Sequence, residues 1–398
     1  MNGTGIIDNL ILHGNNGVID ELISYARSPG LSPPEILYLA KGLAKSGTVI
    51  ENSEFKNLSD IPSTGGPASL STLICPLFLK IFGNQVLKLG VPGRPAGGID
   101  VLSLIDGYNV NPGLEEVSVW IKESGYVHFL ANSEFAPLDK LVFNYRKANN
   151  ALNIPALVVA SILAKKIAVG VKYVGLDIRV SEFGNFGRTW QEARENAQLF
   201  IEVAKLAGIE AKCFITPGAE PQQPYIGRGE ALLALKKIFS GDMNHSLRKH
   251  LGHCFSMASS VSGNKNKEAL SLTLLYDAFA ENVRIQNGSM ESFNDIAEKI
   301  QQAHIYRIIS PESGFLIIKL ENIREAIVNI QQIAGAEIFA DPCGIILMAM
   351  TNDYLSEGDI ICTFRCSDTE KEQFEYDLTR SFEIRPRLIK TYDFEEII

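Results

Sequence analysis

The chain contains the stretch Asp60-Ile61-Pro62-Ser63-Thr64-Gly65-Gly66-Pro67, directly before a helical pattern at Ala68–Phe82. Its Ser and Thr offer hydroxyl groups, and its two Gly residues let backbone N–H groups approach a ligand. The second Pro suits the first position of a helix, and the free N–H groups of a helix start attract phosphate or carboxylate. We therefore predict an anion-binding turn, although the bare pattern is also that of a simple turn into a helix. No Lys or Arg follows before Lys80, so a cation at this site must come from another part of the chain.

A second glycine-rich turn strengthens this prediction. It reads Gly90-Val91-Pro92-Gly93-Arg94-Pro95-Ala96-Gly97-Gly98 and lies between an apolar segment at Val86–Leu89 and a helical pattern at Ile99–Ile105. Both turns therefore connect an apolar segment to a helix, the arrangement that brings backbone N–H groups to a ligand.

Length and composition bound the class of protein. The 398 residues are enough for two or three domains, and 46% hydrophobic with 21% charged residues is typical of a folded soluble protein. The net charge of −9 argues against a nucleic-acid surface, which needs clustered Lys and Arg. The first residues lack a basic start and an apolar run, and no apolar stretch reaches the length of a membrane span. We expect a cytoplasmic protein without nucleic-acid or membrane partners.

Metal chemistry is not expected. The six Cys residues are scattered without the paired spacing of zinc sites, so we interpret them as buried apolar side chains. His245, His250, His253 and Cys254 lie in a helical pattern with no carboxylate cluster beside them, which favours a polar helix face over a metal site.

Helical and strand patterns alternate along much of the chain. Two helical patterns come first, at Val18–Ser28 and Ser32–Ser46, followed after the glycine turns by alternating strand-like and polar segments at Val117–Leu130. The alternation then continues with strands at Tyr173–Val180 and Glu210–Ile215 and helices at Trp190–Gly208 and Ala231–Phe239. This order predicts a mixed or parallel sheet covered by helices. Short strands near the C-terminus predict an α+β lobe, at Phe315–Ile317, Ile338–Phe339, Gly344–Met350 and Asp359–Phe364.

One apolar helix, predicted at Ala156–Ala168, carries polar residues. Ser161 and Lys165 are one turn apart, so they share a face and together could reach into a cleft. We expect the neighbouring Lys166 to extend to solvent. After the strand at Tyr173–Val180, a flexible turn holds Phe183 and Phe186, two aromatics that could serve as a lid.

Seven segments together resemble the pyrimidine-nucleoside phosphorylases, the thymidine phosphorylase family. The match covers nearly the whole chain. Ser63–Gly66 is similar to the end of that family's Lys-His-Ser-Thr-Gly-Gly signature. The other matching segments are Gly97-Gly98 with Asp100, Ala136–Lys140, Ala160–Lys166, Gln223-Pro224, Gly227–Gly229 and Asp341–Ile345.

The resemblance implies a fold and a reaction. The fold would be α/β, with a small all-α domain, a larger α/β domain with a mixed sheet, and an α+β C-terminal lobe, like the class II nucleoside phosphorylases. In this chain these would be residues 1–52 with 136–170, residues 53–135 with 171–305, and residues 306–398. The family cleaves the N-glycosidic bond of a pyrimidine nucleoside with phosphate as co-substrate and no cofactor, and a homodimer is implied.

The base-binding residues of the family have counterparts here. The resemblance implies that Arg146, Ser161 and Lys165 hold the base, with Phe143 where the family has a nearby Tyr. Cationic donors suit this role because the departing base takes up negative charge.

The phosphate side departs from the family. Ile61 and Pro62 replace the signature Lys and His, Leu89 aligns with a phosphate-contacting Ser, and Ile99 aligns with a Thr. Each lost charged contact would cost roughly 1.5–3 kcal/mol, so the nucleophile side has been rebuilt or abandoned. The remaining anion-binding candidates are Ser63, Thr64, Gly65, Gly66, Ser71, Thr72, Arg94, Gly97 and Gly98.

Three interpretations follow. The favoured one is a pentosyltransferase that performs phosphorolysis to free base and (deoxy)ribose 1-phosphate, with Arg94 supplying the missing charge. The second is a hydrolase, a transferase that uses another acceptor, or an enzyme whose substrate carries its own phosphate. The apolar replacements would fit a less ionic acceptor. The third is a catalytically silent pyrimidine-binding protein. The sequence leaves open which base and sugar are recognised.

Overall fold

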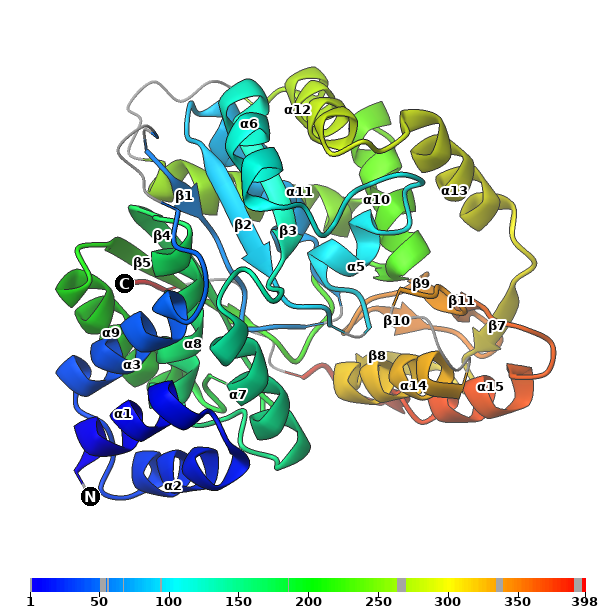
Figure 1. Cartoon of the computed structure of the whole chain (residues 1–398). Helices are drawn as coiled ribbons and strands as arrows, with labels where there is room; N and C mark the ends of the chain where they lie inside the picture. The colour runs from blue at the N-terminus through cyan, green and yellow to red at the C-terminus, as the bar shows by residue number, and fades with distance from the viewer. Residues whose placement is uncertain are drawn as a thin grey trace.

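The computed structural model describes residues 2–50, 55, 57–66, 68–93, 95–184, 186–262, 270–333, 339–389 and 396–398. Figure 1 shows a central sheet between helices, with the first helices on one side and a separate C-terminal lobe on the other. None of the described helices combines the length and the apolar character needed to cross a bilayer.

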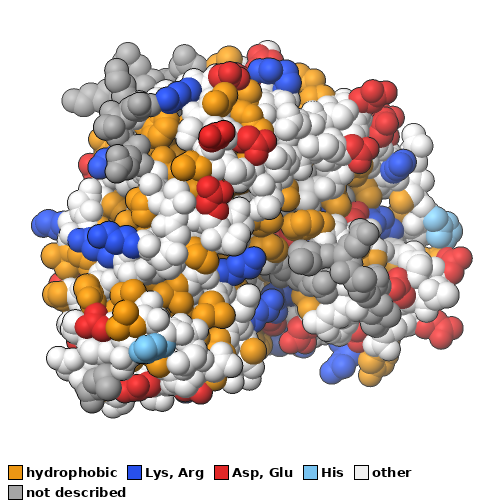
Figure 2. Space-filling view, viewed as in Figure 1, with side chains coloured by type: hydrophobic (Ala, Val, Ile, Leu, Met, Phe, Trp, Pro, Cys, Tyr) orange, Lys and Arg blue, Asp and Glu red, His pale blue; other side chains and the backbone are white. Residues whose placement is uncertain are grey.

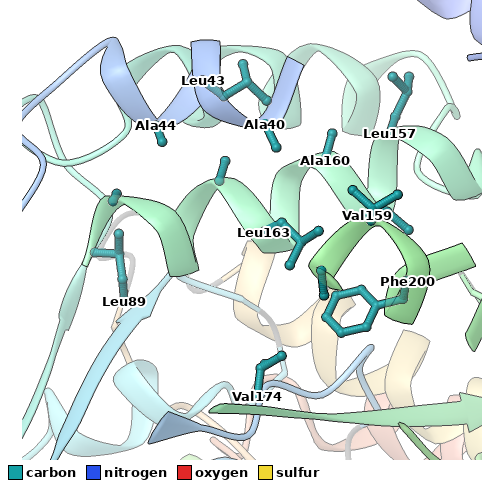
Figure 3. Packing of buried hydrophobic residues seen from close by; sticks show 14 of the residues in the cluster. Ala40, Leu43, Ala44, Leu89, Leu157, Val159, Ala160, Leu163, Val174 and Phe200 are labelled. Atoms are coloured by element: carbon teal, nitrogen blue, oxygen red, sulfur yellow. The ribbon is translucent and has the colours of Figure 1, made fainter. Parts of the chain in front are cut away.

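A helical element packs against the side of the sheet nearest the N-terminus. It comprises α1 (Gly3–His13), α2 (Asn16–Arg27), α3 (Pro33–Lys45), α7 (Pro137–Ala148) and α8 (Pro155–Ala168). The predicted cap of α3 is present, because the carboxylate of Glu35 accepts the backbone N–H of Ser32 at 2.9 Å. Figure 3 shows small side chains of α3 and α8 facing one another, with Phe200 and Val174 below. These residues belong to one continuous apolar core that joins the helical element to the sheet.

The main sheet runs β1 (Ser59–Asp60), β4 (Tyr173–Val180), β5 (Glu210–Pro217), β13 (Glu396–Ile397). The first three strands are parallel and β13 is antiparallel, so the predicted mixed sheet is confirmed. The parallel pair β2 (Val86–Gly90) and β3 (Tyr126–Leu130) continues it through a bridge between Leu58 and Gln85. The two glycine turns follow β1 and β2, and the carboxyl ends of neighbouring parallel strands are where α/β proteins hold ligands.

Helices cover both faces of this sheet. On one face, α9 (Trp190–Leu206) packs on β4 and β5 over the alternate residues Val174, Leu176 and Ile178, as the strand pattern predicts. The opposite face is covered mainly by α4 (Ser71–Ile81) and α11 (His245–Val261). The remaining helices of this part are α5 (Gly98–Leu102), α6 (Leu114–Ser124), α10 (Arg228–Ser240), α12 (Leu272–Ile285) and α13 (Met290–Gln302).

The C-terminal lobe is α+β, as predicted, with its own apolar core. Its four-stranded sheet has the order β6 (Tyr225–Gly227), β9 (Gly344–Leu347), β11 (Ile360–Arg365), β7 (Tyr306–Ile309), and its three-stranded sheet has the order β10 (Tyr354–Leu355), β8 (Gly314–Ile318), β12 (Phe382–Arg385). The helices of the lobe are α14 (Leu320–Ile333) and α15 (Lys371–Thr379). Because β6 precedes α10 in the chain, the lobe is tied to the α/β part by a strand as well as by a linker. The predicted domain boundaries stay a prediction.

Some predicted elements were wrong. The strand-like segments expected across Val117–Leu130 are the helix α6 followed by β3. Glu116 accepts the N–H of Gly113 at 3.0 Å and starts α6, a capping signal that the alternating pattern obscured. Phe339 lies in a turn rather than a strand, and Ile338 lies outside the described residues.

Candidate active site

The first glycine turn extends the parallel sheet through a bridge between Ser63 and Asp177. The helix predicted at Ala68–Phe82 is α4, which begins only at Ser71 after the N-cap residue Leu70, so the predicted start directly after the glycines was wrong. Thr64 donates its N–H to the carbonyl of Asp177 at 2.9 Å, and Asp177 donates to the carbonyl of Pro62 at the same distance. Gly65 and Gly66 have φ angles of 121° and 128°, which side chains rarely allow, and no atom lies within 4 Å of where their Cβ atoms would be. The backbone of both glycines is therefore open to a ligand, as the sequence predicts for an anion-binding turn.

A cation that the sequence analysis missed lies beside this turn. Arg179, on β4, has a side chain that is only 6% exposed. Its Nη2 donates to the carboxylate of Asp177 and to the hydroxyl of Ser69, each at 2.6 Å. Ser71, at the start of α4, donates to the same carboxylate at 2.9 Å. We call Ser63–Gly66, Ser69, Ser71, Asp177 and Arg179 the turn cluster. Its sequence signal is two charged residues at the carboxyl end of a parallel strand.

His250 closes the turn cluster from α11. Its Nε2 accepts the backbone N–H of Leu70 at 2.9 Å, so the imidazole holds the entry to α4. Burial, followed by the charge of Arg179, lowers the pKa of His250 well below its usual value. The predicted polar face was therefore wrong for this residue, which is buried and structural. No group of three or more potential metal ligands occurs within the part of the chain that the structure describes.

The second glycine turn packs against the start of α4, which brings the two turns together. A Cβ on Gly98 would lie 2.8 Å from the ring of His128 and 3.1 Å from the hydroxyl of Thr72, so only glycine fits there. Asp100 fastens the turn by accepting the N–H of Gly93 at 2.8 Å, and burial raises the pKa of Asp100 to about 6. Arg94, the predicted source of positive charge, lies outside the described residues.

Beneath the turns lie three buried charges. The carboxylate of Asp60 accepts from Lys88 at 2.8 Å and also from Lys166. The side chain of Lys166 is 2% exposed, so the prediction that it extends to solvent was wrong. The reason is tertiary, because Lys166 of α8 forms an ion pair with Asp60 of β1 instead of meeting water.

A second cluster lies on α7 and α8. Lys165 donates to the carboxylate of Asp139 at 2.5 Å and to the hydroxyl of Ser161 at 3.0 Å, so the predicted shared face is confirmed. Asp139 was not predicted as a site residue, although it lies in a segment that resembles the family. We call Asp139, Arg146, Ser161 and Lys165 the helical cluster.

Arg146 is anchored by the main chain of the loop between α7 and α8 and of the first turn of α8. It donates to the carbonyl groups of Ala151, Leu157 and Leu152 at 3.0–3.2 Å. Burial lowers its pKa to about 10, although the charge of Asp139 acts in the opposite direction. Its role toward a base stays a prediction, as does that of Phe143, which lies half-buried on the same helix.

The two aromatics predicted as a lid have different environments. Phe186 is fully buried in the core that contains α9, whereas Phe183 is 65% exposed. Only Phe183 could therefore move over a bound ligand without unpacking the core. On the surface, Figure 2 shows a hollow between the helical element and the C-terminal lobe, with Lys and Arg side chains beside it.

Two further segments that resemble the family form the junction with the C-terminal lobe. Arg365 of β11 donates to Glu230 at 2.6 Å and to Asp341 at 2.5 Å. A Cβ on Gly344 would lie 1.7 Å from the carboxylate of Glu230, which explains the glycine there. Arg228 continues the junction to the second glycine turn through Asp100, at 3.1 Å. These segments therefore support the site from outside it.

Comparisons with known proteins find similarity to phosphorylases. No family model matches it. It is 28% identical to thymidine phosphorylase of Sinorhizobium fredii over 201 residues, which is 50% of this chain and 46% of the relative. It is 26% identical to AMP phosphorylase of Methanococcus maripaludis over 387 residues, or 92% of this chain and 73% of the relative. Its fold matches anthranilate phosphoribosyltransferase from Thermus thermophilus with a TM-score of 0.53 at 15% identity, covering 75% of this chain and 94% of that one. The chain is thus a distant relative of the thymidine and AMP phosphorylases.

Proposed function

We propose that the protein is a pentosyltransferase that cleaves the N-glycosidic bond of a nucleoside or nucleoside monophosphate, with inorganic phosphate as the nucleophile. The observation that carries this proposal is Arg179. It places a guanidinium and two hydroxyls, those of Ser69 and Ser71, beside an open glycine turn that has no cation of its own. A guanidinium with hydroxyl neighbours is a chemistry that recognises phosphate oxygens.

The two clusters supply the two halves of the reaction. In the turn cluster, backbone N–H groups, hydroxyls and Arg179 hold phosphate so that one of its oxygens faces the anomeric carbon. That oxygen forms the new C1′–O bond while the C1′–N bond breaks. The electron pair of the C1′–N bond leaves with the base. In the helical cluster, Lys165 and Ser161 donate to the base as its negative charge develops. Donors aimed at developing charge in a site that excludes water lower the barrier most effectively.

The apolar replacements do not favour a less ionic acceptor. Ile61, Leu89 and Ile99 are 0%, 3% and 2% exposed, and the first two belong to the apolar cores on opposite faces of the sheet. Their side chains therefore pack inward instead of lining a binding surface. This removes the main support for a hydrolase or for a transferase with an apolar acceptor.

The choice of base has two candidates. The helical cluster matches the residues expected to hold a pyrimidine, and a thymidine phosphorylase is among the relatives. The AMP phosphorylase match extends over 92% of this chain, against 50% for the thymidine phosphorylase, so a purine nucleoside monophosphate is the second candidate. A homodimer and a cytoplasmic location stay predictions.

Product analysis tests the proposal. The purified protein is incubated with uridine, thymidine, cytidine, adenosine and AMP, each with and without phosphate, and free base and sugar phosphate are measured. We expect base release only with phosphate, in equal amount to a sugar 1-phosphate. Release without phosphate would contradict phosphorolysis, and binding of a base without any release would show a silent binder.

A further inference from the structure

We propose that Lys88, Asp60 and Lys166, which we call the buried triad, supply the unbalanced positive charge of the anion site from beneath the glycine turns. This inference rests on the proposed function, because it assumes that the turn cluster binds an anion. It assigns a role to Lys88, a residue outside every segment that resembles the family. It also replaces Arg94 as the source of charge.

The triad is fully enclosed and its bonds are defined. Lys88 Nζ donates to Asp60 Oδ1 at 2.8 Å and to the carbonyl of Ile61 at 2.9 Å. Lys166 Nζ donates to the other carboxylate oxygen. The side chains of Lys88, Asp60 and Lys166 are 6%, 1% and 2% exposed. Two lysines on one carboxylate leave a formal excess of one positive charge.

The carboxylate of the triad is ionised. Burial alone would raise the pKa of Asp60, but the charges of Lys166 and Lys88 outweigh it and hold that pKa well below its usual value. The neighbouring His128 adds no charge, because burial and the charge of Lys88 lower its pKa well below the usual value. Its Nδ1 lies 3.1 Å from the hydroxyl of Tyr126, a group whose pKa burial raises. The excess of one charge is therefore not cancelled by these neighbours.

Among the residues that the structure describes, two further ion pairs beside the turns are balanced. Arg179 is matched by Asp177, and Arg228 by Asp100. Arg179 therefore provides donors, whereas the triad provides net charge. An excess charge held away from water is costly unless another charge compensates it, and an anion in the open turn above would do so.

The position of the triad suits this role. Asp60 directly precedes the first glycine turn, and Lys88 lies two residues before Gly90, where the second turn begins. The ammonium of Lys88 therefore sits between the starts of both turns, beneath the site and not in it. Lys166 links the triad to α8, and its neighbour Lys165 belongs to the helical cluster. The buried triad and the helical cluster thus share one helix, α8.

Titration calorimetry with inorganic phosphate tests this role through net charge. Lys88→Met leaves a neutral Asp60–Lys166 pair, and we expect phosphate affinity to fall on the order of tenfold, as for a unit charge acting across several ångströms of protein interior. The double variant Asp60→Asn with Lys88→Met leaves Lys166 alone and restores the excess charge. At mildly acidic pH, which keeps Lys166 protonated, we expect the double variant to bind within a few-fold of wild type. Lys41→Met, which removes an exposed lysine of α3, is the matched control and should bind as wild type does.

The outcomes separate this inference from the proposed function. If wild type binds phosphate and Lys88→Met binds equally well, the triad has no such role. If the double variant binds more weakly than the single variant, the triad acts only through packing, which also overturns the inference. No phosphate binding by wild type would instead contradict the proposed function.

A measurement on wild type covers the case in which the variants do not fold. Buried ammonium groups exchange slowly enough to be followed by NMR in protein labelled with ¹⁵N at lysine Nζ. We expect phosphate to shift the protected lysine signals. Unchanged signals at saturating phosphate would overturn the inference.

Discussion

The helical cluster and the turn cluster hold cations in opposite ways. In the helical cluster, Lys165, Ser161 and Asp139 come from two consecutive helices, and two of the three are one turn apart on the same helix. In the turn cluster, Arg179 reaches the first glycine turn from β4, more than a hundred residues along the chain. The first cluster is therefore specified by local spacing and the second by strand pairing. In the anion site that we propose, positive charge therefore comes from neighbouring strands and not from the first glycine turn itself.

The largest effect is expected from replacing Arg179, which belongs to the turn cluster and not to the helical cluster. Arg179→Met removes a charged contact to phosphate, so we expect the KM for phosphate to rise about 100-fold while the KM for the nucleoside changes little. It also leaves Asp177 buried without its cation, which costs about 3–5 kcal/mol of stability. Steady-state kinetics and urea unfolding measure the two effects.

A charge-balanced variant separates the loss of phosphate binding from the loss of stability. Asp177→Asn with Arg179→Gln removes both charges together, so the protein should be more stable than Arg179→Met yet equally poor with phosphate. A wild-type KM for phosphate in the double variant would show that Arg179 serves only the fold.

The converse experiment targets the helical cluster. Lys165→Met removes a donor to the departing base, and we expect kcat/KM for the nucleoside to fall about 10–100-fold with phosphate affinity unchanged. Lys140→Met, on the exposed side of α7, is the matched control and should behave as wild type. Loss of phosphate affinity in Lys165→Met would contradict the separation of the two clusters.

Lowering the pH should reduce the stability that His250 contributes beside the turn cluster. The pKa of buried His250 is lowered, so below its unfolded value of about 6.5 the unfolded chain binds a proton that the folded protein does not. The contribution of His250 to the free energy of unfolding is therefore fully present above that pH. It declines as the pH falls, by up to about 1.4 kcal/mol per pH unit. Urea unfolding across this range measures the slope. His250→Gln should reduce the slope, and an unchanged slope would mean that other groups, such as His128, account for it.

The last prediction compares two glycines, and the smallest effect is expected at the second of them. Gly66→Ala places a side chain at a φ angle of 128° and should cost about 1–3 kcal/mol, together with weaker phosphate binding. Gly252→Ala, in the exposed middle of α11 with no atom within 4 Å, should instead stabilise by about 0.5–1 kcal/mol. Thermal unfolding of both variants measures these effects. Equal effects in both would mean that the turn has no special backbone requirement.

The sequence predicted what depends on nearby residues. The glycine turns, the pairing of Ser161 with Lys165 and the mixed sheet all follow from short patterns, and each is present. Lys166 was misplaced because its environment depends on β1, which lies against α8 only in the folded protein.

Arg179 and Lys88 were missed for the same reason. Lys88 is the one charged residue of β2, and Arg179 shares β4 with Asp177. The role of either residue can be inferred only when the strand order is known. The replacements at Ile61 and Leu89 looked like a loss of binding function, but their burial shows that they serve the core. A residue type alone does not show which way its side chain points at a strand end.

The most direct test of phosphorolysis follows the oxygen atoms of phosphate. The protein is incubated with a nucleoside that it cleaves and with phosphate labelled with ¹⁸O at all four oxygens. The mass of the sugar phosphate is then measured. If phosphate attacks the anomeric carbon, its oxygen bridges to the sugar and all four labels are retained. A sugar product that carries oxygen from water at the anomeric carbon would contradict the account.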